Sequence, residues 1–134
     1  MHVGSLVFVM LSNPRLMPGH LLVVPKRHVE TLAELNVEER RELFDTAIEF
    51  QGQIMERLAP GCDIRQHCRP FLPEGRLKVH HVHLHLLPRA LNDELYQKVQ
   101  KFEQEVFEEF GEEEREEMTK ILKRGIKGGN NITH

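Results

Sequence analysis

Histidine and aliphatic residues alternate near the middle of the chain, in the order His81, Val82, His83, Leu84, His85 and Leu86. A period of two is typical of a β-strand with one buried face, so the three imidazoles are predicted to share the other face. Neighbouring histidines would then lie about 6.6–6.8 Å apart along the strand. Imidazole titrates close to neutral pH, so this row offers a nucleophile, a proton donor and a partner for a phosphate.

A zinc site is the alternative for these histidines, because imidazole is a common zinc ligand. Zinc–nitrogen bonds are about 2.0–2.1 Å long, whereas His81 and His85 are predicted to lie about 13 Å apart. One ion could therefore take two of the three imidazoles but hardly all of them. We accordingly expect the row to act on an anionic substrate, and we expect no protein-bound metal.

The stretch from His81 to Leu87, His-Val-His-Leu-His-Leu-Leu, resembles the His-φ-His-φ-His-φ-φ motif (φ apolar) of the histidine triad, or HIT, superfamily. About sixty residues earlier, Pro18-Gly19-His20 and the residues up to His28 resemble a second signature of that family. Two signatures in the right order make the resemblance specific, and it covers roughly residues 5 to 90. Leu87-Pro88-Arg89 and the acidic segment after it are most similar to the Fhit branch.

The resemblance implies cleavage of a phosphoanhydride or phosphoramidate bond at the α-phosphate of a nucleotide conjugate. His83 would attack phosphorus and form a nucleotidyl-histidine, which water then hydrolyses. His81 and His85 would bind phosphate oxygens and assist the leaving group, and His20 would orient the triad. The attacking nitrogen must be unprotonated, so the other nitrogen of His83 is predicted to donate to a backbone carbonyl near His20. No cofactor bound by the protein is expected, although the substrate could carry Mg²⁺.

The chain departs from the family pattern where the nucleotide would be held. At the position of the family's ribose-binding Asp or Asn stands Ser12, followed by Asn13, and either side chain could hydrogen-bond a hydroxyl group. The usual Gln and Ser/Thr before the triad are replaced by Leu77 and Lys78. Lys78 would offer a cation to a phosphate if a bulge turned it toward the triad. In an undistorted strand Lys78 points to the opposite face, as does His80, which is predicted to be structural.

Three strands and one helix are predicted to position these residues. Ser5–Leu11 is a near-continuous apolar run, which predicts a strand buried on both faces. Leu21–Val24 and Cys62–Cys68 are also predicted to be strands. The triad strand is expected to stop at Pro88, because proline cannot extend a central ladder. Asn36-Val37-Glu38-Glu39 forms a capping box for an amphipathic helix that ends at Pro60-Gly61.

Two charged runs, Lys26–His28 and Glu38–Glu42, are predicted to be solvated. Beyond Arg89, helical patterns begin at Asn92 and again at Glu112, and the second places Met118, Ile121 and Leu122 on one side. The predicted fold is α+β, a HIT-like antiparallel sheet with one main helix and a C-terminal helical extension. Residues 1–90 would form the core, 91–125 the extension of the same domain, and 126–134 a flexible tail. Met1 almost directly precedes the first strand, so we expect either that the family's N-terminal hairpin is missing or that the sequence given begins after it.

Composition limits the possible partners and compartments. The chain has 134 residues and a net charge of −3, which argues against nucleic-acid binding through a basic surface. No apolar run has transmembrane length and no signal peptide opens the sequence, so we expect a cytoplasmic protein that does not bind membranes. Cys62 and Cys68 are expected to be reduced thiols. The resemblance implies a homodimer that binds a nucleotide.

Three functions remain open from the sequence. The first is a dinucleoside polyphosphate hydrolase of the Fhit type, favoured by Leu87-Pro88-Arg89 and the acidic extension. The second is a nucleoside phosphoramidase of the Hint type, disfavoured by the absent Gly-Gln-Ser element. The third is a non-catalytic nucleotide-binding sensor, against which the intact triad argues.

Overall fold

A computed structural model describes residues 1–13, 15–73, 80–93, 109 and 111–124. The chain divides into two compact units, Met1–Lys98 and Val99–His134. The first unit contains a sheet and a long helix, and the second contains a further helix, so the predicted α+β class is confirmed. That the C-terminal extension belongs to the same domain as the core stays a prediction.

The first unit is built on a five-stranded antiparallel sheet with the strand order β1-β2-β3-β5-β4. Its strands are β1 (His2–Val3), β2 (Val7–Leu11), β3 (Leu21–Pro25), β4 (Gly61–Arg65) and β5 (Leu84–Arg89). β5, the strand that carries the end of the histidine row, lies between β3 and β4 and pairs with both. The row is therefore attached to the centre of the sheet.

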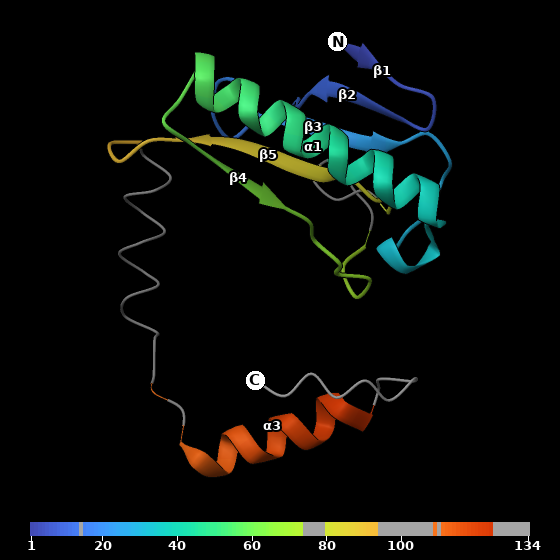
Figure 1. Cartoon of the computed structure of the whole chain (residues 1–134), viewed down its shortest axis with the longest axis vertical. Helices are drawn as coiled ribbons and strands as arrows, with labels where there is room; N and C mark the ends of the chain where they lie inside the picture. Colours follow the sequence, from blue (N-terminus) through green and yellow to red (C-terminus); the bar gives the residue numbers. More distant parts are fainter. Residues whose placement is uncertain (14, 74–79, 94–108, 110, 125–134) are drawn as a thin grey trace. The chain divides into compact units, whose positions relative to one another are not determined.

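The long helix α1 (Val37–Arg57) lies across one face of the sheet (Figure 1). Asn36 caps it as predicted, because its side chain accepts from the Glu39 amide while the Glu39 carboxylate accepts from the Asn36 amide. Leu43, Ala47 and Ile54 from the helix join the buried valines and leucines of β2, β3 and β5 in one core. Burial of this apolar surface fixes which side of each strand faces α1.

The prediction that Ser5–Leu11 is buried on both faces is wrong. Val7 and Val9 are buried under α1, but Met10 is 41% exposed and Leu11 59% exposed. α1 covers only one face of the sheet, and Leu11 at the end of β2 remains largely exposed. A continuous apolar run therefore came from a strand with one covered face.

Strand boundaries also differ from those predicted. A two-residue strand, β1, precedes β2 and pairs with it, although no earlier strand was expected. β4 ends at Arg65 rather than Cys68. β5 continues through Pro88, which pairs with Cys62 of β4. β3 pairs with β5 only as far as Leu86, so Pro88 lies where one side of β5 has no partner strand, a position that tolerates proline.

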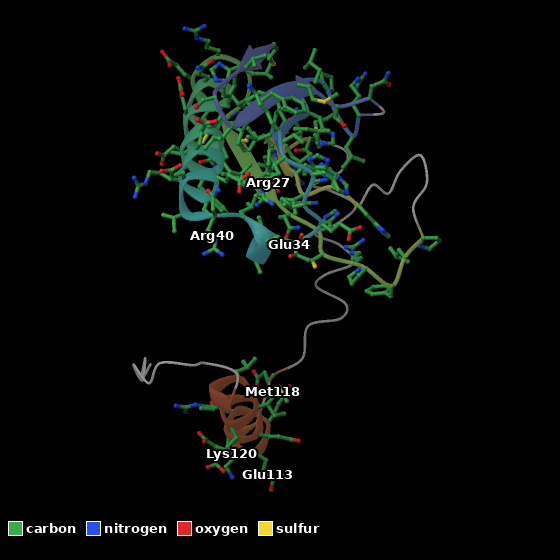
Figure 2. All side chains as sticks on the ribbon, turned by 90° about the vertical axis from the view of Figure 1, so that its right-hand side faces the viewer. Arg27, Glu34, Arg40, Glu113, Met118 and Lys120 are labelled. Carbon is green, nitrogen blue, oxygen red and sulfur yellow. The ribbon has the colours of Figure 1, made fainter. Side chains whose placement is uncertain are left out.

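The two charged runs predicted to be solvated make specific contacts. Glu39 is 3% exposed and forms an ion pair with Arg27, with Nη2 and Oε1 2.8 Å apart. Arg27 also donates to the Glu34 carbonyl oxygen in the short helix η1 (Leu32–Glu34), and Figure 2 shows these two residues side by side. Glu42 accepts hydrogen bonds of 2.6 Å each from the amides of Leu6 and Val7. These contacts join α1 to the ends of β2 and β3.

The second unit contains α3 (Glu112–Arg124), a charged helix with Met118, Ile121 and Leu122 exposed on one side. Within the part of the chain that is described, no helix combines the length and apolarity needed to cross a bilayer. Lys78, the helix predicted to begin at Asn92 and the predicted flexible tail lie wholly or mainly outside the described residues. Cys62 and Cys68 are free thiols, and burial raises the pKa of Cys62 to about 11.

Candidate active site

The histidine row lies on the sheet face that α1 does not cover. His81 and His83 come just before β5, and His85 lies within it, yet the alternation predicted from the sequence holds throughout. The three histidines are half-buried, whereas Val82 and Leu84 between them are buried. The aliphatic side chains of this segment thus anchor it in the core while the imidazoles remain accessible.

A chain of hydrogen bonds joins the imidazoles of His20, His85 and His83 and fixes where each proton sits. At one end the Leu16 amide, which can only donate, lies 3.1 Å from Nδ1 of His20. At the other end Nδ1 of His83 lies 2.7 Å from the His81 carbonyl oxygen, which can only accept. Between them, His20 Nε2 is 2.9 Å from His85 Nδ1, and His85 Nε2 is 3.1 Å from His83 Nε2.

Only one set of neutral tautomers satisfies all four contacts. His20 accepts at Nδ1 and donates from Nε2, and His85 accepts at Nδ1 and donates from Nε2. His83 carries its proton on Nδ1, so its Nε2 has a lone pair that faces the Nε2–H of His85. The predicted donation from His83 to a backbone carbonyl is present, but the acceptor is His81 on the same segment rather than a carbonyl near His20.

Burial keeps the two supporting histidines neutral. The pKa of His85 is lowered to about 3, mainly by burial and then by repulsion from His83, His20, His67 and Arg65, in that order. Burial, followed by repulsion from His83, also lowers the pKa of His20, which is 3% exposed. At neutral pH both imidazoles therefore keep the single proton that the hydrogen-bond chain requires.

His81 is held separately from this chain. Its Nε2 donates to the Pro25 carbonyl oxygen at 2.9 Å, and its Nδ1 lies 3.2 Å from Nδ1 of His28. The two rings meet edge to face with centroids 4.9 Å apart. His28 is exposed, as predicted for a solvated strand end, and its imidazole also contacts that of His81. His80 instead donates to the Leu72 carbonyl oxygen at 2.9 Å, in keeping with the structural role predicted for it.

The structure adds two residues that the sequence analysis did not single out. The His67 ring lies 5.2 Å from that of His85, centroid to centroid. Arg65 of β4 pairs directly opposite His85 of β5, and residues opposite each other in antiparallel strands project to the same face. The spacing of Arg65 and His67 by two residues was the available signal. It acquires meaning only once β4 is known to lie beside the triad strand.

Ser12 lies at the β2–β3 turn, beside the end of the histidine chain. Its amide donates to the His20 carbonyl oxygen at 2.8 Å, which extends the β2–β3 pairing by one step. By strand alternation Ser12 shares the open face with Met10 and His20. Asn13 follows at an exposed position of the turn. Ser12 is therefore adjacent to His20 across the strand pair, and the ribose-binding role of Ser12 and Asn13 stays a prediction.

Among the residues that the structure describes, no group of three or more His, Cys, Asp or Glu side chains has the arrangement of a metal site. The imidazole nitrogens of this face are instead directed at one another and at backbone groups. The arrangement suits nucleophilic attack on an electrophile by His83, with neutral His85 as the adjacent hydrogen-bond donor.

Comparison with known proteins agrees with this arrangement. The HIT domain family model matches residues 4–92. The bis(5'-nucleosyl)-tetraphosphatase [asymmetrical] of Schizosaccharomyces pombe is 31% identical over 113 residues, which are 75% of this chain and 61% of that protein. The bifunctional bis(5'-adenosyl)-triphosphatase/adenylylsulfatase FHIT of Arabidopsis thaliana is 30% identical over 110 residues, 78% of this chain and 60% of that protein. The chain thus spans about three fifths of the length of these relatives.

Among solved structures, a member of the HIT family from Bacillus subtilis superposes with a TM-score of 0.73. The match covers 96% of this chain and 88% of that one at 17% sequence identity, so it concerns the fold. The sequence match extends over both signatures and the helix between them. From the family match, the curated relatives and the shared fold, we conclude that the chain belongs to the HIT family.

Proposed function

We propose that this protein hydrolyses a phosphoanhydride bond at the α-phosphate of a dinucleoside polyphosphate or a similar nucleotide conjugate, through a nucleotidyl-histidine on His83. The observation that carries the proposal is the fixed tautomer of His83. Its Nδ1 proton is held by the His81 carbonyl oxygen at 2.7 Å, so the lone pair needed for attack is on Nε2. The names of two relatives, a tetraphosphatase and a triphosphatase of nucleotide substrates, support this substrate class.

In the first step, Nε2 of His83 attacks the α-phosphorus and forms a P–N bond while the bridging P–O bond breaks. The leaving group departs as a phosphate anion and needs no proton, while neutral His85 keeps its Nε2 proton and donates it as a hydrogen bond to an oxygen of the α-phosphate beside the attacking nitrogen, 3.1 Å away. In the second step, water attacks the same phosphorus and the P–N bond breaks. His83 Nε2 regains its lone pair, one proton of that water is released to solvent, and the other stays with the new phosphate or is released as well.

His20 and His81 would assist without forming bonds to phosphorus. His20 donates to His85 Nδ1 at 2.9 Å and thereby keeps the His85 proton on Nε2, toward the reacting atoms. The His81 side chain is held by Pro25 and His28 at the other end of the row. The mechanism needs no protein-bound metal, although Mg²⁺ could arrive with the substrate.

The direct test is to quench a reaction with α-³²P-labelled diadenosine tetraphosphate in denaturant and measure label on the protein. Wild type should label, and the label should be lost in acid, where P–N bonds hydrolyse. His83→Ala should not label and should lose at least about a thousandfold in turnover, since it lacks the nucleophile. His2→Ala, which removes a histidine from the edge strand β1, should behave as wild type.

Turnover without labelling, together with near-normal activity of His83→Ala, would refute the nucleotidyl-histidine. A panel that pairs dinucleoside polyphosphates with nucleoside phosphoramidates decides between the two enzyme classes. Preference for the phosphoramidates would favour the Hint-type activity. Tight nucleotide binding without turnover of either class would favour the sensor.

A further inference from the structure

The two flanks of the histidine row differ in charge. On the β3 side, the open face carries Ser12, Met10 and Leu22, which are all uncharged. On the β4 side, it carries Arg65 and His67. A nucleotide conjugate has a similar asymmetry about the bond that is cleaved, because a nucleoside lies on one side and further phosphates can lie on the other.

Arg65 is held beside His85 by two contacts. Its pairing opposite His85 sets the direction of the side chain. Its Nη2 then lies 3.1 Å from Oδ2 of Asp63, two residues earlier on the same strand. The positive charge of Arg65 is also among the causes that lower the pKa of His85, which indicates its proximity to the site.

Asp63 is shared between two arginines of different accessibility. Arg89 Nη1 makes the shorter contact with Asp63 Oδ2, at 2.7 Å, and Arg89 Nε lies 3.1 Å from Asp93. The Arg89 side chain is only 10% exposed, whereas that of Arg65 is 35% exposed. Arg89 thus supports the structure with two carboxylates around it, while Arg65 can be reached by a ligand. Guanidinium binds phosphate oxygens in a bidentate manner and stays protonated at any physiological pH.

We propose that Arg65, with His67 beside it, forms a subsite for an anionic leaving group, that is, for phosphate groups beyond the α-phosphate. The inference rests on the proposed function and narrows its substrate class. In-line attack by His83 requires the leaving group to depart on the side opposite the attacking nitrogen. If the nucleoside lies on the uncharged β3 flank, the leaving group meets the β4 flank and its fixed cation. The preferred leaving group is then a nucleoside mono- or polyphosphate and not an uncharged amine.

The test compares Arg65→Gln with wild type on two substrates that share the adenylyl group. Diadenosine tetraphosphate has a phosphorylated leaving group, and adenosine 5'-phosphoramidate has ammonia as its leaving group. Arg65→Gln should lower kcat/KM about tenfold or more for the first substrate and less than about threefold for the second. Arg65→Lys, which keeps the charge but loses the fork, should fall between wild type and Arg65→Gln. Arg41→Gln, the same change on α1 across the sheet, should leave both values unchanged.

Equal losses on both substrates, or no loss on either, would overturn the subsite. If Arg65→Gln proves too unstable to measure, Arg65→Lys and His67→Asn carry the same substrate comparison. A binding measurement distinguishes failure of the Arg65 subsite from failure of the proposed function. By calorimetry, Arg65→Gln should bind ADP about tenfold more weakly than wild type does and AMP less than about twofold more weakly. If wild type turns over neither substrate but Arg65→Gln still shows this selective loss of ADP affinity, the subsite is retained and the proposed hydrolysis is rejected. If His83 is labelled but Arg65→Gln loses ADP and AMP affinity equally, the hydrolysis is retained and the subsite is rejected.

Discussion

Two backbone groups, one at each end of the hydrogen-bond chain through His20, His85 and His83, determine which nitrogen of each imidazole carries the proton. The Leu16 amide directs the proton of His20, and the His81 carbonyl oxygen directs that of His83. His85 lies between them and takes its tautomer from both neighbours. A substitution at one end should therefore disturb the proton at the other end.

We expect His85 to make stability depend on acid pH. Its folded-state pKa is lowered to about 3, mainly by burial, so the unfolded chain takes up a proton near the ordinary value of 6.5 while the folded chain does not. The free energy of unfolding should thus fall as pH drops below about 6.5, by up to about 1.4 kcal/mol per pH unit from this group. Above that pH its contribution is constant.

Urea unfolding at several pH values between 4 and 7.5 measures this effect. His85→Asn should show a shallower loss of stability in acid than wild type does. His2→Ala is the control, because His2 is an exposed histidine that takes no part in the hydrogen-bond chain of the site. This variant should lose stability in acid as steeply as wild type does. Parallel slopes for wild type and His85→Asn would contradict the prediction.

The sequence predicted the four central histidines but not their partners, for a physical reason. Strand alternation places His81, His83 and His85 on one face without reference to any other segment. His28 comes after β3 has ended, where side-chain direction no longer follows a period of two. His67 likewise lies beyond β4. Their contacts with the triad depend on which strands are neighbours, and that order is a property of the folded sheet.

At the scale of elements, Glu42 is the main polar connection between α1 and the start of β2. Its carboxylate accepts from the amides of Leu6 and Val7 and from the Ser5 hydroxyl, each at 2.6 Å. These bonds, that from Ser5 most of all, lower the pKa of Glu42. Glu42→Ala should lower the free energy of unfolding by about 2 kcal/mol, because two backbone amides lose a charged acceptor.

Chemical denaturation of Glu42→Ala against Glu49→Ala checks this prediction. Glu49 is an exposed glutamate on the same helix, so its removal should change stability by less than about 0.5 kcal/mol. Equal effects of the two substitutions would mean that water replaces the carboxylate at β2. The pattern Glu38–Glu42 alone gave no indication of this contact, since two of its glutamates bind other segments and three charges point to solvent.

Gly19, just before His20, provides a second test at this scale. Its φ is +85°, and a Cβ there would collide with the Leu58 side chain and lie 3.2 Å from Cγ of Pro88. Gly19→Ala should cost more than about 1 kcal/mol in stability and displace His20, with a loss of turnover. Gly52→Ala is the control, because a Cβ at this position in α1 meets nothing within 4 Å. It should raise stability by about 0.5–1 kcal/mol and leave turnover unchanged. Equal stability of the two variants, measured by thermal unfolding, would show that the turn adapts.

Element types were easier to predict than their limits and their burial. The cap at Asn36 and the period of α1 are local, so the helix follows from the sequence. Burial of β2 on one face only, and the continuation of β5 through Pro88, depend on where α1 and β3 stop covering or pairing with them. No single segment contains that information.

The helix α3 of the second unit has an exposed apolar side made of Met118, Ile121 and Leu122. Glu112, Glu113 and Glu114 stabilise its first turn against the helix dipole. Met118 is 44% exposed, Ile121 52% and Leu122 69%, and the three lie on one side of the helix. Figure 2 labels Met118 on the side of α3 away from Glu113 and Lys120. A 13-residue helix is only marginally stable by itself, so an apolar side of this kind requires a covering surface.

We expect a homodimer in which this apolar side is buried. Sedimentation of dilute wild-type protein should give about twice 15.7 kDa. The double variant Ile121→Gln with Leu122→Gln keeps helix propensity but removes apolar area, so its mass should shift toward 15.7 kDa. Glu116→Gln with Lys120→Gln alters the opposite side without changing net charge and should remain dimeric. If the Ile121→Gln/Leu122→Gln variant stays dimeric, another surface joins the subunits. If wild type is a monomer with full turnover, dimerisation is unnecessary for activity. The apolar side of α3 is then not buried by a second copy of the chain.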